Sequence, residues 1–250
     1  MGMVDWGGRL VQSIDLNACF REVNMTRIVT TASVAILSSL VVGVSAFEVP
    51  QASAPQRIDL VQQLTAGKLK AVNREIAPAS GDRLAVHLSE KEGPGVVWLA
   101  GSNFAEGTIE LEVRGRDLLQ RSFLGVAFHG KDDNTYEAVY LRPFNFRADD
   151  PARHQHAVQY MASPDFDWPR LRKEFAEEFE NPVDPSVAPT DWVPLRVVVK
   201  GQTVQIFVGA VKAPTLEARK LGNLTSGLLG LWVGNNSDGD FRNLRVTQAK

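Results

Sequence analysis

The chain has 250 residues and a formal net charge of −2, with 44% hydrophobic and 22% charged residues. This is the composition of an ordinary globular protein. The near-neutral balance argues against a nucleic-acid partner, because such proteins usually carry a basic patch.

The N-terminal segment has the character of a targeting signal. A start methionine and Arg27 precede an apolar stretch at 28–44, and Val44-Ser45-Ala46 matches the small-residue pattern before a signal cleavage site. We therefore expect residues 1–24 to be an upstream extension of the reading frame and residues 25–46 to be a signal peptide. The protein would then be exported, to the periplasm or the extracellular space. The alternative is an uncleaved membrane anchor, for which the stretch is near the minimum length.

Cys19, the chain's only cysteine, lies in the part that we expect to be removed. The mature region would then have no disulfide, no thiol nucleophile and no cysteine-based metal site. Its stability must come from an apolar core, and the roughly 200 remaining residues are enough to form one as a single domain. We expect residues 47–66 to form a leader and residues 67–250 to form that domain.

Short apolar runs separated by turn residues follow from residue 69 onwards. The alternation is clear at 108–114, and the runs at 123–129 and 136–142 flank a polar turn, which predicts a hairpin. Further strands are predicted at 83–88, 95–99, 156–161, 193–200, 204–208, 214–218, 228–234 and 241–247. About a dozen short strands with frequent turns indicate an all-β fold, a two-sheet antiparallel β-sandwich.

Residues 163–191 interrupt this rhythm. Helix formers at 168–179, with Pro169 suited to a first helical turn, predict one short helix in a long loop. Three later prolines end regular structure. Long loops of this kind often serve a binding site.

The hairpin at 123–146 has two different faces. The face predicted to line the core carries Leu124, Val126, Phe128, Val139 and Leu141, and the opposite face carries His129, Tyr136, Tyr140 and Arg142. Aromatic rings stack on sugar rings, while guanidinium and amide groups bond to hydroxyls. We therefore predict a saccharide site formed by Tyr136, Tyr140, Arg142, Asn145, Gln159 and Trp232. A solvated sheet face without a ligand is the alternative, and Trp98, Trp168 and Trp192 are other platforms that could equally be core or loop anchors.

Catalytic candidates on the same face are His129, Glu137 and Arg142, because a histidine beside a carboxylate can act as an acid–base pair. A calcium ion is the candidate cofactor, with Asn235, Asp238 and Asp240 of an oxygen-rich loop as ligands, although such loops also form turns without a metal. His154 and His156 would share a strand face, but two ligands are too few for a metal site.

Three segments resemble the concanavalin A-like jelly roll of lectins and glucanases. These segments are Gly107–Val113, the Gly125–Phe146 hairpin and Gly230–Gly234 followed by Asp240-Phe241. More narrowly, they are similar to laminin-G-like and 3-keto-disaccharide-hydrolase-like domains of exported bacterial proteins. The resemblance implies two packed sheets with a concave face that often handles sugars. Retaining glucanases of this fold carry three acids on one strand face, whereas here Glu110 and Glu112 stand alone and fit solvated strand positions better.

We therefore expect an exported carbohydrate-binding domain that recognises a glycan on its concave sheet face. One alternative is a glycoside hydrolase or lyase acting at that face, and another is a non-catalytic envelope interaction domain. No nucleic acid is expected as a partner, and no membrane beyond the signal segment.

Overall fold

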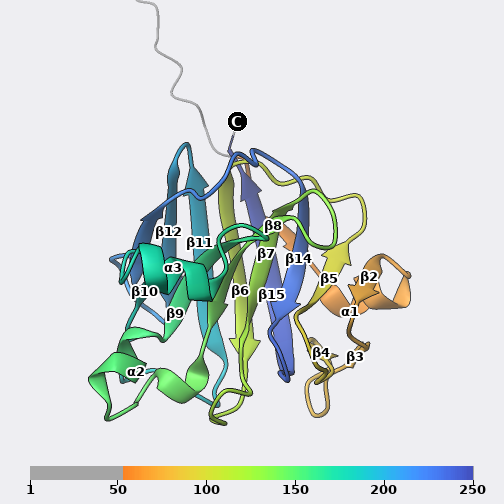
Figure 1. The fold of residues 1–250 in the computed structure, drawn as a ribbon. Coiled ribbons are helices and arrows are strands. Elements are labelled where there is room, and N and C mark those ends of the chain that lie inside the picture. The colour runs from red at the N-terminus through yellow and green to blue at the C-terminus, as the bar shows by residue number, and fades with distance from the viewer. Residues whose placement is uncertain (1–52, 250) are drawn as a thin grey trace, which may run out of the picture. The chain divides into compact units, whose positions relative to one another are not determined.

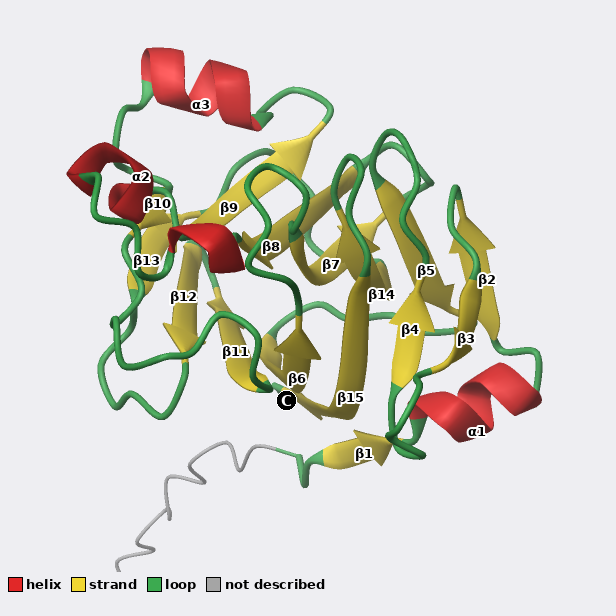
Figure 2. Cartoon of the chain, turned by 90° about the horizontal axis from the view of Figure 1, so that it is seen from below, coloured by secondary structure: helices red, strands yellow, loops and turns green. Residues whose placement is uncertain are grey.

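The computed structural model describes residues 53–249, which form two antiparallel sheets packed face to face (Figure 1). The predicted upstream extension and signal peptide lie outside these residues. Seen along the sandwich, the two rows of strands form separate layers (Figure 2). The predicted two-sheet antiparallel β-sandwich is therefore confirmed.

Sheet A carries the chain's last strand near its centre. Its order is β13 (Leu216–Arg219), β12 (Thr203–Val208), β11 (Val193–Lys200), β6 (Gly107–Arg114), β15 (Gly239–Gln248), β4 (Val86–Leu88) and β3 (Ile76–Pro78), and β1 (Gln56–Ile58) also pairs with β15. The last strand thus pairs with early ones, as in a jelly roll.

Sheet B contains the hairpin that the sequence singled out. Its order is β10 (Glu180–Asn181), β9 (Val158–Ser163), β8 (Tyr136–Leu141), β7 (Leu124–Gly130), β14 (Leu228–Val233), β5 (Gly95–Leu99) and β2 (Leu69–Val72). Strands β7 and β8 are buried along their whole length.

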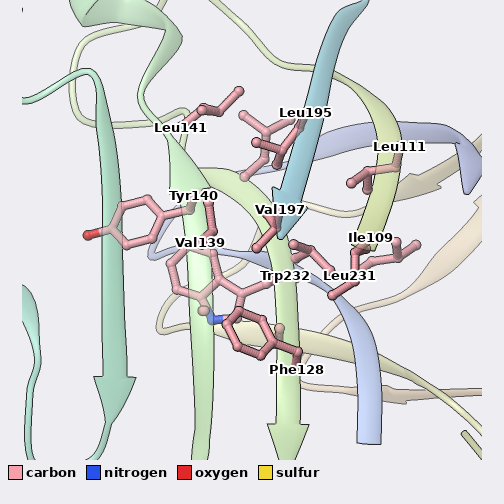
Figure 3. Packing of buried hydrophobic residues seen from close by; sticks show 14 of the residues in the cluster. Ile109, Leu111, Phe128, Val139, Tyr140, Leu141, Leu195, Val197, Leu231 and Trp232 are labelled. Carbon is pink, nitrogen blue, oxygen red and sulfur yellow. The ribbon is translucent and has the colours of Figure 1, made fainter. Parts of the chain in front are cut away.

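The core lies between the sheets. In sheet B, Val126 stands opposite both Val139 and Leu231, and sheet A contributes Ile109 and Leu195 among its inward residues (Figure 3). Each of these side chains is at most 1% exposed, and each such burial stabilises the fold by about 1.5 to 3 kcal/mol. The inward face predicted for the hairpin is confirmed.

The helices are more numerous than predicted. The expected helix is α3 (Trp168–Glu174), but α1 (Leu60–Thr65), α2 (Pro151–Gln155) and a 3₁₀ turn, η1 (Pro143–Asn145), are also present. In α1, α2 and α3 an aspartate caps the first turn by accepting a backbone N–H bond. Helices this short give little periodic signal, which is why the sequence pattern missed two of them. Within the described part of the chain, no helix has both the length and the apolar character needed to cross a membrane.

Two local predictions need correction. Part of the predicted leader belongs to the sandwich, since β1 pairs with β15 and Leu60 is almost fully buried. The predicted strand at 156–161 begins at Val158 instead. His154 lies in α2 and His156 caps it, because Asp150 and Pro151 start a helix there, so the two histidines do not share a strand face.

Candidate functional site

One row of residues crosses four strands of sheet B on its outer face. Trp232 pairs with Gly125, Gly125 with Tyr140, and Tyr140 with Gln159. Gly125 places no side chain between the two aromatic residues, so their ring centroids lie 4.7 Å apart. Tyr140 points away from the sheet A residues Leu111, Leu195 and Val197 (Figure 3). The alternation of β8 thus directs Tyr136, Tyr140 and Arg142 to the outer face, as predicted.

Hydrogen bonds and the ring contact between Tyr140 and Trp232 join the six predicted saccharide ligands into one group, which we call the Arg142 cluster: Tyr136, Tyr140, Arg142, Asn145, Gln159 and Trp232. The Tyr140 hydroxyl donates to Gln159 Oε1 at 2.6 Å, and Arg142 Nη2 donates to the same oxygen and to the Tyr140 hydroxyl. Trp232 Nε1 donates to the Tyr136 hydroxyl at 3.1 Å.

Asn145 joins the cluster through a backbone carbonyl. Asn145 Nδ2 and Arg142 Nη1 both donate to the carbonyl oxygen of His156, each at 3.0 Å. The 3₁₀ turn η1, which begins directly after Arg142, brings Asn145 back over the end of β8.

Glu180 of β10 is the residue of this site that sequence reasoning missed. Its Oε1 accepts from Arg142 Nη1 at 2.7 Å and from Arg172 Nη2 at 2.8 Å, and its Oε2 accepts from Arg172 Nε at 2.9 Å. Burial alone would raise the pKa of the Glu180 carboxyl, but the Arg172 hydrogen bond and the charge of Arg142 outweigh it, so the pKa is lowered. Glu180 is therefore a fixed anion beneath the two arginines.

His156 and Arg172 form the more exposed side of the site. Their side chains are 27% and 33% exposed, whereas that of Glu180 is 4% exposed. His156 Nδ1 lies 2.8 Å from Glu180 Oε2, at an angle unfavourable for a hydrogen bond. Burial lowers the pKa of His156 more than Glu180 raises it. Trp168, which is 49% exposed, stacks under Arg172, and we call these three residues the rim.

Two buried amide atoms of the Arg142 cluster have no hydrogen-bond partner among the described residues. They are Asn145 Oδ1, an acceptor, and Gln159 Nε2, a donor. An unpaired buried polar atom costs about 1 to 3 kcal/mol, so native structures rarely leave one without a reason. A hydroxyl group can donate and accept at once, which makes it a suitable partner for both kinds of atom.

The six residues of the Arg142 cluster are nevertheless buried, each at most 4% exposed. Burial raises the pKa of the Tyr140 hydroxyl, with a further contribution from the charge of Glu180, and it also raises the pKa of Tyr136. Both hydroxyls therefore stay protonated and act as neutral hydrogen-bonding groups.

The predicted outward position of His129 is wrong. His129 has a φ of 52°, and the pairing of β14 with β7 shifts register beside it, so the strand bulges there. Its Nδ1 lies 3.0 Å from Glu137 Oε1 and its Nε2 lies 2.6 Å from the Ala105 carbonyl oxygen. Both side chains are fully buried. The pair exists, but it belongs to the interior of the sandwich.

Glu137 has further partners inside the core. The Tyr160 hydroxyl donates to Glu137 Oε2, and Lys220 Nζ lies 3.6 Å from Oε1. The Tyr160 hydroxyl also accepts the backbone N–H of Leu221. Of the three catalytic candidates, only Arg142 lies on the outer face of sheet B.

The predicted calcium ligands have protein partners instead. Asp240 accepts from Arg114 and contacts His87 at 2.8 Å, Asp238 lies 2.7 Å from Arg116 Nε, and Asn235 Oδ1 accepts the Gly93 N–H. Within residues 53–249 no three His, Cys, Asp or Glu side chains gather as a metal site. Arginines therefore neutralise these aspartates, and calcium binding by this loop stays a prediction.

The other candidates have structural surroundings. Glu112 accepts from Arg242 and Asn243, and Glu110 stands opposite Arg196 and Arg245, all on the outer face of sheet A. Trp98 is buried and donates to Asp133, while Trp192 packs against two arginines.

The contribution of Glu180 and Arg172 had one weak signal in the sequence. Both lie in the loop at 163–191, which was expected to serve a binding site, but nothing in its residue pattern fixes which side chain reaches Arg142. The loop positions them because α3 lies next to β9 and β10 (Figure 2).

No protein-family model matches the sequence, and no curated protein matches it. The fold, however, has solved counterparts. A Bacillus subtilis protein of unknown function with a galectin-like fold has a TM-score of 0.54 at 15% identity, over 80% of this chain and 98% of its own. The carbohydrate-binding module CBM66 from Bacillus subtilis has a TM-score of 0.50 at 15% identity, over 71% and 93% of the two chains.

The legume lectin-like domain from Entamoeba histolytica has a TM-score of 0.50 at 10% identity, over 79% of this chain and 97% of its own. These similarities establish the fold, which is the concanavalin A-like jelly roll that the sequence resembled.

Proposed function

We propose that this chain is an exported, non-catalytic carbohydrate-binding domain that binds a glycan at the Arg142 cluster. The observation that carries the proposal is the pair of buried, unpartnered amide atoms, Asn145 Oδ1 and Gln159 Nε2, in a cluster of aromatic and guanidinium groups. The names of two solved counterparts, a carbohydrate-binding module and a lectin-like domain, support the same function.

The glycan enters from the rim. There Trp168 offers an exposed aromatic face, and Arg172 and His156 offer polar edges. A hydroxyl that reaches inward donates to Asn145 Oδ1 or accepts from Gln159 Nε2. Because Arg142 and Glu180 already hold one another, the site is rigid before the ligand arrives, which lowers the entropic cost of binding.

Binding is favoured over hydrolysis by the acid content of the cluster. Glycoside hydrolases of the usual kind need two carboxylates on either side of the scissile bond. Among the described residues, Glu180 is the one carboxylate bonded to this cluster, and arginines hold both of its oxygens. The other candidate acid, Glu137, is fully buried on the opposite face of sheet B.

A glycan array with the wild type, Asn145→Ala and Gln205→Ala tests the proposal. Asn145→Ala removes the unpartnered acceptor, whereas Gln205 lies on sheet A and bonds to Glu217 in an exposed position, so it is the matched control. We expect the wild type and Gln205→Ala to bind the same glycans and Asn145→Ala to lose about ten-fold in affinity. Circular dichroism checks that each variant is folded.

Two results would overturn the proposal. One is a wild type that binds no glycan on the array, and the other is unchanged affinity in Asn145→Ala. Release of reducing sugar from a bound glycan would replace it with the hydrolase alternative.

A further inference from the structure

A cleft of about 500 Å³ lies on the other sheet, away from the Arg142 cluster. Its polar lining comes from the loop between β3 and β4, from β4, from β6 and the loop after it, and from β15 and the loop before it. The polar residues are Ser80, His87, Arg114, Arg116, Asp238 and Asp240. This volume lies within the usual range for small-molecule sites. Nothing in the proposed glycan site uses these residues.

The carboxylates of the cleft are already engaged. Asp240 Oδ2 accepts from Arg114 Nε at 3.0 Å and from Nη2 at 2.7 Å, while its Oδ1 lies 2.8 Å from His87 Nδ1. Asp238 Oδ1 lies 2.7 Å from Arg116 Nε, although the two atoms are not aligned for a hydrogen bond. The two acids therefore serve mainly to position three basic side chains.

The basic side chains keep unused donors. Among the described residues, no partner is bonded to Arg114 Nη1, Arg116 Nη1 or His87 Nε2, and all three side chains are about one third exposed. With His87 protonated, three cations and two anions line the cleft. The hydrogen-bonding capacity that remains is mostly donor capacity, which suits an anion.

The acid beside His87 favours its charged form. The hydrogen bond with Asp240 raises the pKa of His87, against the effect of burial, and Asp238 adds to the rise while Arg116 opposes it. The edge strand packed against β4 adds no charge there, since Ala77 stands opposite His87. The cleft is therefore more positive at mildly acidic pH than at alkaline pH.

We propose that this cleft is a second binding site, for a small organic carboxylate of about monosaccharide size. The carboxylate lies against Arg116 and His87, and the ligand's hydroxyls meet Ser80 and Arg114. The site is independent of the proposed glycan site, because the two use opposite sheets and share no residue.

Isothermal titration of D-glucuronate and D-glucose tests the proposal, since the two sugars share a ring and differ in the carboxylate. We expect glucuronate to bind more tightly than glucose, and more tightly at about pH 6 than at about pH 9. Arg116→Gln and His87→Gln should each weaken glucuronate binding by about five-fold or more. Arg170→Gln, which removes an arginine from an exposed pair with Glu174, is the matched control and should bind as the wild type does.

Asn145→Ala separates this proposal from the glycan site, because it should leave glucuronate binding intact even where array binding is lost. Equal affinity for the two sugars, or full glucuronate affinity in Arg116→Gln, would overturn the second site. Thermal melting of each variant checks that it is folded. The pKa of His87, followed by NMR, should rise further when glucuronate is bound, since binding and protonation are linked.

Discussion

Glu180→Gln removes the negative charge that holds Arg142 and Arg172 together while keeping the shape of the side chain. Glu180 and Arg142 are both 4% exposed, so their charges are poorly screened. Breaking a buried pair on one side costs about 3 to 5 kcal/mol. Because Arg172 is one third exposed, we expect the lower end, about 3 kcal/mol. For a domain of roughly 200 residues this lowers the melting temperature by roughly 6 to 12 °C.

The matched control is Glu178→Gln, two positions away, whose carboxylate lies 4.0 Å from Arg219 with both side chains more than half exposed. It should melt as the wild type does.

The effect of Glu180→Gln should also depend on pH. Because folding lowers the pKa of the Glu180 carboxyl, its contribution to the stability of the fold is fully present above the ordinary pKa of 4.5. That contribution is lost as the pH falls through the pKa of Glu180 in the folded protein. Equal melting temperatures for the two variants at neutral pH would refute the reasoning.

Three further outcomes are expected from other parts of the fold. Tyr160→Phe removes a hydroxyl that bonds to a buried carboxylate and to a backbone N–H. It should lower the free energy of unfolding, measured in urea, by about 1 to 3 kcal/mol. An unchanged midpoint of urea unfolding would contradict the buried network. Gly230→Ala would place a Cβ 2.7 Å from Trp98 Cε3 and should destabilise by about 1 to 3 kcal/mol, so a wild-type melting temperature would show that the packing is looser. Because folding raises the pKa of His87, the stability that its pairing with Asp240 contributes is fully present below the ordinary pKa of 6.5. This stability is lost as the pH rises through the pKa of His87 in the folded protein, and melting curves of His87→Gln across that interval should lack the loss.

The hairpin shows how far sequence alone could go. A strand places alternate residues on opposite faces, so the inward position of Val139 and the outward position of Tyr140 followed directly from the pattern. The convergence of Trp232 and Gln159 on Tyr140 needed the pairing of four strands, which no local pattern specifies.

His129 and Glu180 show where the sequence was insufficient. A single residue with positive φ turned His129 to the opposite face, and alternation assumes that no such bulge occurs. Glu180 reaches Arg142 across 38 positions of sequence, through a loop whose path depends on α3 packing beside sheet B. The protein partners of the oxygen-rich loop at 235–240 could not be predicted for a related reason, since the arginines that neutralise its aspartates come from a distant strand and loop.

The burial of the Arg142 cluster makes the route of the ligand the sharpest question about this site. A ¹H–¹⁵N NMR spectrum recorded during titration with a glycan that binds on the array answers it directly. We predict that the side-chain amide signals of Gln159 and Asn145 and the indole signal of Trp232 shift together. The indole signal of Trp168, at the rim, should shift with them. Shifts confined to sheet A, such as the indole signal of Trp192, would contradict a glycan site at the Arg142 cluster.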